Sequence, residues 1–145
     1  MIDPDDLATA GWAQASLRIA SDRMSADAIS EALGLRPTST RTSEGEPSFA
    51  VWVFESGLDP TAPIEDHLYL LMERLRERHD QLTLVADAAN VEIWLSFSPA
   101  GTSGRSAVFD HRVLGELGAL GVDLVLDPYP AGRARRAPLR WDPAR

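Results

Sequence analysis

The sequence predicts an α+β domain with a ferredoxin-like antiparallel sheet, made from two strand–helix–strand units and an extra long middle helix. Apolar residues alternate with a period of two in four segments, and they recur with helical spacing in the segments between them. The expected order is strand, helix, strand, long helix, strand, helix, strand. Each strand–helix–strand unit favours a right-handed crossover, and two such units interleave naturally in one sheet with helices on one face.

The domain is expected to occupy most of the chain. The chain has 145 residues, the usual size of one domain. Residues 1–14 contain a proline and a run of acids and are expected to form an N-terminal lead-in. Residues 15–127 carry the alternating and helical patterns of a single α+β domain, and residues 128–145 form a C-terminal tail rich in Arg and Pro.

The first unit starts with a half-buried strand over residues 15–21. Ser25 is suited to cap the N-terminus of the helix that follows, and Gly34 stands where a left-handed residue commonly ends a helix. Residues 38–47 are polar and are expected to form a loop. The second strand covers residues 49–55, and because both of its faces are apolar we expect it in the middle of the sheet.

Apolar spacing and capping residues also predict the middle helix and the second strand–helix–strand unit. The longest apolar stripe begins near Ile64, and the helix can continue with a bend as far as Asn90. A strand is expected over residues 91–97, then a helix with Asp110 as its N-cap, then a last strand over residues 122–127.

Charge and composition narrow the classes of function. The net charge is −8, all 14 basic residues are Arg, and Cys is absent, which excludes disulfides and thiolate chemistry. Residues 128–145 hold five Arg against one Asp, so residues 1–127 carry −12. Such an acidic body repels phosphate backbones, and we expect no nucleic-acid partner for it.

Location is predicted from what the sequence lacks. No apolar run approaches the ~20 residues of a membrane span, so no membrane association is expected. The N-terminus is acidic and has no basic region before an apolar stretch, unlike a secretory signal. We therefore expect a cytoplasmic protein.

Five segments in a matching order resemble a bacterial family known as domain of unknown function 4279. They are ASLRIAS with SADAISEALGLRPT, then WVFESGLD, then EDHLYLLMERL, and finally LGALGVDLVLD. The resemblance covers roughly residues 15–127 and leaves out the Arg-rich tail. It implies a stand-alone cytosolic domain and brings no catalytic residue with it. Small acidic proteins of this kind that occur near toxin genes hint at an immunity role.

Histidines and carboxylates are the first candidates for chemistry. His67 and His79 are twelve residues apart on the expected middle helix, so they cannot share a metal, and we expect no metal site and no cofactor. His67 is expected to be solvated or packed at an edge. Asp123 and Asp127 alternate on one face of the last strand, and they could form a paired acid site if Glu92 lies across from them.

Other sequence motifs give no support for catalysis. The Gly/Ser-rich segment at residues 101–106 lacks the Walker spacing and its Lys, and no serine lies in a nucleophile-elbow motif. We therefore predict no catalytic residue, and the sequence favours a protein that is not an enzyme.

One face of the sheet is the remaining candidate site. If Leu17, Val51, Ile93 and Leu124 face the helices, alternation turns another set of residues to a second face. That set is the predicted binding site: Arg18, Trp52, Phe54, Trp94 and Val125.

Three explanations remain open for this aromatic face, because a patch of this kind is seldom left bare. The middle helix or the tail, through Leu139 and Trp141, could cover it. A second subunit or another protein could bind there, since aromatic residues and Arg are favoured anchors. It could also form a small-molecule cleft in which Arg18 orients an acidic group.

The sequence therefore favours a small protein-interaction module, regulatory or of the immunity type, with an acidic surface. Its partner would be another protein or a second copy of the chain. The alternative is a ligand-binding domain or enzyme with a cleft on the second sheet face, using Arg18 with Asp123 or His67.

Overall fold

The computed structural model describes residues 11–98 and 106–130, which form a five-stranded sheet and four helices. Within these residues, no helix has both the length and the apolar character needed to cross a bilayer. The strands are β1 (Trp12–Ser21), β2 (Ser39–Thr42), β3 (Ala50–Glu55), β4 (Asn90–Ser98) and β5 (Asp123–Pro128). The helices are α2 (Ala26–Leu33), α3 (Ile64–Arg76), α4 (His79–Ala88) and α5 (His111–Leu120).

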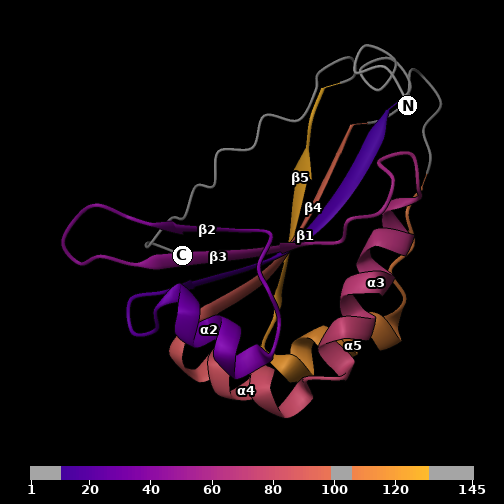
Figure 1. Cartoon of the computed structure of the whole chain (residues 1–145). Coiled ribbons are helices and arrows are strands. Elements are labelled where there is room, and N and C mark those ends of the chain that lie inside the picture. Colours follow the sequence, from indigo (N-terminus) through magenta and orange to yellow (C-terminus); the bar gives the residue numbers. More distant parts are fainter. Residues whose placement is uncertain (1–10, 99–105, 131–145) are drawn as a thin grey trace.

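The sheet has the order β2-β3-β1-β4-β5 and carries all four helices on one side (Figure 1). All neighbouring strands pair antiparallel except β4 and β5, which are parallel. The prediction of an α+β domain is confirmed. The ferredoxin-like layout is not confirmed, because β1 and β3 are direct antiparallel neighbours and are not joined by a parallel crossover.

Capping residues set the limits of the helices on either side of the middle region. Ser25 has an extended backbone and its side chain accepts a hydrogen bond from the backbone N–H of Ala28. Asp110 does the same for α5, accepting from the N–H groups of Arg112 and Val113. Gly34 ends α2 in the left-handed region, at φ 64°.

A short strand replaces part of the expected loop at residues 38–47. Ser39–Thr42 forms β2 and pairs antiparallel with β3 at the edge of the sheet. All four of its side chains are exposed, so no alternation of apolar and polar residues marks it in the sequence. The prediction of a loop is wrong over these residues, because backbone pairing with β3 forms the strand.

The middle helix is two helices and not one long element. α3 ends at Arg76 and α4 begins at His79, and between them Arg78 leaves helical geometry, at φ −128° and ψ 28°. The Arg78 side chain ties this break to α2, since its Nε donates to the carbonyl of Leu33 at the end of α2 over 2.9 Å. The change of direction lets both helices turn their apolar side to the same core.

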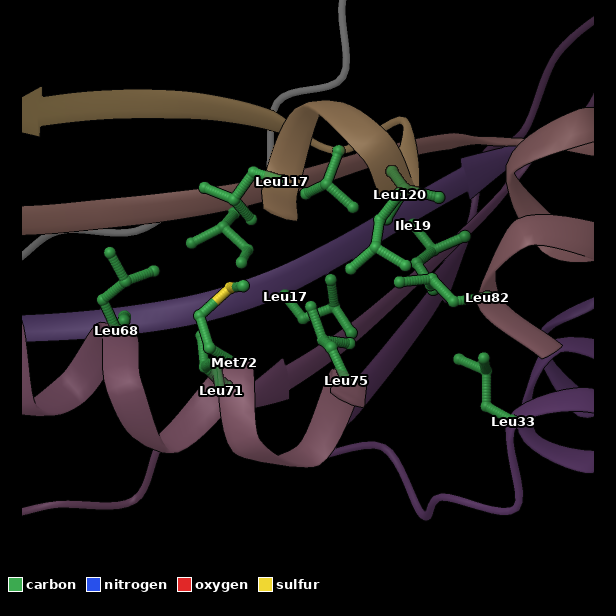
Figure 2. Packing of buried hydrophobic residues seen from close by; sticks show 14 of the residues in the cluster. Leu17, Ile19, Leu33, Leu68, Leu71, Met72, Leu75, Leu82, Leu117 and Leu120 are labelled. Carbon is green, nitrogen blue, oxygen red and sulfur yellow. The ribbon is translucent and has the colours of Figure 1, made fainter. Parts of the chain in front are cut away.

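The main core lies between the helices and the sheet (Figure 2). β1 contributes Leu17 and Ile19 to it, and helices α2 to α5 cover them with buried leucines. The buried residues labelled in Figure 2 are Leu17, Ile19, Leu33, Leu68, Leu71, Met72, Leu75, Leu82, Leu117 and Leu120.

Candidate functional site

The strand register decides which side chains share a face of the sheet. Leu17 and Ile19 lie in the helix-covered core, and they pair with Phe54 and Trp52 respectively. Partners in register point to the same side, so Trp52 and Phe54 also face the helices. The prediction that these two aromatic residues lie on the second face is wrong.

Trp52 belongs fully to the core. Its side chain has no exposed surface, its ring stacks on Phe54 with centroids 6.3 Å apart, and its Nε1–H donates to Ser30 Oγ over 2.9 Å. Val51, which was expected to face the helices, instead packs with Val53 and Ala20 in a small cluster on the other side. Alternation alone could not choose, because both sets of side chains on β3 are apolar.

Arg18, Trp94 and Val125 do lie on the second face, the side of the sheet that none of the described helices covers. The Arg18 guanidinium carbon stands 4.2 Å from the centroid of the Trp94 ring, in a cation–π contact. The indole Nε1–H of Trp94 donates to Glu92 Oε2 over 2.7 Å. This pair of contacts fixes the orientation of the Trp94 ring.

Carboxylates line the β4–β5 border of the second face. In the register, Glu92 lies opposite Asp123, Trp94 opposite Val125, and Ser96 opposite Asp127. The condition for a paired acid site is therefore met for Asp123, which lies opposite Glu92, but not for Asp127, which lies opposite Ser96. Ser96 Oγ donates to Asp127 Oδ2 over 3.0 Å. We name this group the acidic strip, and it consists of Glu92, Trp94, Asp123, Val125 and Asp127.

Solvent exposure on the second face rises toward the acidic strip. At the β1–β3 centre, Val53 is 2% exposed and Arg18 is 7% exposed, although no helix of the described part lies over them. Along β4 and β5, by contrast, Trp94 and Val125 are half-buried and Asp123 is exposed. The exposed parts of the second face in the described residues are thus its two borders, β2 with Ser39 and Arg41, and β4–β5 with the acidic strip, which is the border that carries carboxylates.

A second polar group lies on the opposite, helix-covered side. His67 in the first turn of α3 is fully buried, and its Nδ1 is 2.6 Å from Ser56 Oγ. Its Nε2 is 3.1 Å from the backbone carbonyl of Asp59. Because a carbonyl oxygen can only accept, Nε2 carries the proton, and in the neutral ring Nδ1 accepts from the Ser56 hydroxyl. Burial lowers the pKa of His67, which favours this neutral form.

The expectation of a solvated or edge-packed His67 is wrong, and helical spacing explains why. Residue 67 is three after Ile64 and four before Leu71, so it lies on the apolar stripe of α3. The imidazole joins this helix to the loop after β3, and both ring nitrogens are satisfied within the protein. The contact between Ser56 and His67 was not anticipated, although alternation from Trp52 and Phe54 places Ser56 on the same side.

The other proposed partners of Arg18 lie in different places. His67 is across the sheet from Arg18, so the two cannot share one site. Asp123 is on the same face as Arg18 but two strands away, because Arg18 pairs with Glu92 and Glu92 with Asp123. Two strand spacings amount to about 10 Å, and Glu92 occupies the position between them.

The described residues were also compared with the ligand sets that hold metal ions. Among residues 11–98 and 106–130, no group of three or more His, Asp or Glu side chains is arranged to hold a metal ion. Leu139, Trp141 and most of the Gly/Ser-rich segment lie outside the described residues.

Trp12, in the expected lead-in, is buried and packs on Tyr129 just after β5, with ring centroids 5.1 Å apart.

These features define an α+β domain with one helix-covered face and an acidic strip on the other. The chain belongs to the family described as domain of unknown function (DUF4279), whose model matches residues 11–131. No curated protein and no solved structure matches the chain.

Proposed function

We propose that this protein is a small interaction module that binds a positively charged protein through the acidic strip. The observation that supports it is the register of β4 and β5, which sets Glu92 beside Asp123 and Trp94 beside Val125. Acidic groups around an aromatic and an aliphatic residue are the features that basic protein surfaces complement. The net charge of −8 works in the same direction by attracting a basic partner over longer range.

Trp94 is the expected anchor of this surface. Its ring face is held by Arg18 and its indole N–H by Glu92, so little conformational freedom is lost when a partner packs on it. Aromatic side chains that are oriented in advance carry much of the binding energy in protein interfaces. A regulatory or immunity-type role is compatible with such a surface and requires no catalytic group.

The experiment is a capture assay with the full chain immobilised, using products of neighbouring genes at about 50 mM and about 300 mM salt. The test variant is Trp94→Ser, and the matched control is Tyr69→Ser, because Tyr69 is an exposed aromatic residue on α3. We expect a basic protein to bind the wild type and the Tyr69 variant, to bind Trp94→Ser much less, and to dissociate as salt rises. Equal capture by all three proteins, or capture that does not depend on salt, would remove the acidic strip from the interaction.

A small acidic ligand is the second candidate, and Arg18 is the observation that favours it. Its side chain is 7% exposed, its guanidinium lies against the Trp94 ring, and its Nε donates to Ser16 Oγ over 3.4 Å, so a positive charge is held in a fixed position on this face. A ligand bound only by the folded state would raise the melting temperature. A metabolite screen by thermal shift, repeated with Arg18→Ala, tests it, and a shift that persists in the variant would exclude Arg18 as the binding group.

A further inference from the structure

The backbone of β5 forms an edge of the sheet. β5 is last in the strand order and pairs only with β4 among the described residues. In such a strand, alternate N–H and C=O groups point away from the sheet and can pair with another extended chain. The edge therefore offers a row of directional hydrogen bonds beside the acidic strip.

The two edges of the sheet differ in the side chains they present. The opposite edge is β2, only four residues long, and all of its side chains are polar and exposed. Short polar edges of this kind are a common protection against pairing. β5 instead carries Leu126, which is 57% exposed, on the helix side of the edge. It is thus the edge better suited to accept a strand.

α5 adds a second exposed leucine to this side. Glu116 of α5 accepts a two-pronged ion pair from Arg76 of α3, so that flank of α5 faces α3. Leu114 is two residues earlier, about 200° around the helix axis, and so lies on the opposite flank, toward the outer side of β5. It is 47% exposed. Leu114 and Leu126 together make the helix side of this edge apolar.

The second-face side of the same edge is acidic. Asp123 and Asp127 project from β5 to that side with Val125 between them. They are four residues apart along a strand, about 13 Å. An added strand would complement these two carboxylates with basic residues at positions i and i+4, because both side chains emerge on the same face of a strand. Its other face would carry apolar residues.

We infer that β5 accepts an extended segment of the partner as a sixth strand, with arginine or lysine facing Asp123 and Asp127 and apolar side chains facing Leu114 and Leu126. This inference rests on the proposed function and names the binding mode of its partner. Main-chain pairing supplies affinity in such complexes, and the alternating side chains supply selectivity.

Charge disfavours one arrangement of a second copy of the chain at this edge. In a two-fold antiparallel pairing centred on Val125, Asp123 of each chain would lie opposite Asp127 of the other. Like charges directly opposite each other destabilise a strand pair. The same carboxylates that attract a basic strand therefore discriminate against self-association in this register.

Two synthetic peptides of about ten residues test the inference against the full chain. In the first, two arginines are four residues apart among valines and threonines, so both emerge on one face of a strand. The control has the same composition with the arginines three residues apart, so they emerge on opposite faces. Binding is followed by NMR through amide shifts and deuterium exchange of β5.

We expect the first peptide to bind and protect the outward amides of β5, and the control peptide to bind about tenfold more weakly. Leu126→Arg should weaken the first complex to a similar extent. Leu84→Arg should not, since Leu84 is a 71% exposed leucine on α4, away from this edge.

Three results would overturn the inference. The first is no protection of β5 by the first peptide, or equal affinity for both peptides. The second is concentration-dependent protection without peptide, which would make a second copy the occupant. The third is β5 amides that are protected in the free chain and released by Arg133→Ser with Arg135→Ser, which would make the chain's own tail the occupant. Partner capture that depends on Trp94 while β5 stays unprotected would leave the proposed function standing without this binding mode.

Discussion

Trp52 and Trp94 stand on opposite faces of one sheet, and their surroundings differ in every respect. Trp52 is fully buried, stacks on Phe54 and donates its indole proton to Ser30 in a helix of its own domain. Trp94 is half-buried, lies under an arginine and donates to a carboxylate of its own strand. The first has the environment of a core residue, and the second lies on the half-exposed border of the sheet face that no described helix covers.

The largest expected effect is the difference in the free energy of unfolding between the alanine variants of Trp52 and Trp94. Trp52→Ala should lower the free energy of unfolding by about 3–5 kcal/mol, because it leaves a cavity between sheet and helices. Trp94→Ala should cost less than half as much, since this side chain is only half-buried and lies outside the core between the sheet and the helices. Urea unfolding of both variants measures the difference, and equal losses would contradict the assignment of Trp94 to a surface.

The second-largest loss of stability is expected from a substitution of His67, on the helix-covered side of the sheet. His67→Leu should lower the free energy of unfolding by about 2 kcal/mol, because it deprives the Ser56 hydroxyl and the Asp59 carbonyl of their partner. The control is His79→Gln, at an exposed position on α4, which should change stability by less than about 0.5 kcal/mol. A neutral effect of His67→Leu would mean that these hydrogen bonds contribute little to the fold.

The pH dependence of stability should also depend on His67. Burial lowers its pKa in the folded state, so between that pKa and the unfolded value near 6.5 only the unfolded chain binds the extra proton. Stability should therefore be full above about pH 6.5 and fall as the pH decreases toward the folded pKa, by at most about 1.4 kcal/mol per pH unit. Thermal unfolding in His67→Leu should lose this slope, while His79→Gln should keep it.

The smallest effect on stability is expected in the acidic strip, where a substitution should stabilise the protein and not destabilise it. Asp123 lies beside Glu92 in the register, and like charges at such positions are destabilising. Asp123→Asn should therefore raise the free energy of unfolding by about 0.2–1 kcal/mol. The matched control is Asp87→Asn on exposed α4 surface. A loss of stability in the Asp123 variant would mean that the carboxylate serves the fold.

Much of the fold could be predicted because local chemistry determines it. Ser25, Gly34 and Asp110 mark helix ends through hydrogen bonds and backbone conformation that involve only neighbouring residues. The strand order, the antiparallel pairing of β1 with β3, and strand β2 depend on contacts between distant segments. No local pattern encodes them, and the ferredoxin-like layout was inferred without them.

The candidate site was predictable to the extent that alternation was unambiguous. On β4, Glu92 and Ser96 mark the polar face on either side of Trp94, so Trp94 was placed on the correct face. On β3 both faces are apolar, so Trp52 and Phe54 could be placed only by their register with β1. The size of the side chains was the available signal, since the larger aromatic pair fills the space under the helices.

We propose that the acidic strip is maintained for binding and not for stability. Two quantities measured on Asp123→Asn test this proposal: the free energy of unfolding, and the affinity for the peptide with arginines four residues apart. We expect the variant to be as stable as the wild type or slightly more stable, and to bind the peptide several-fold more weakly. A variant that is less stable and binds equally well would contradict it.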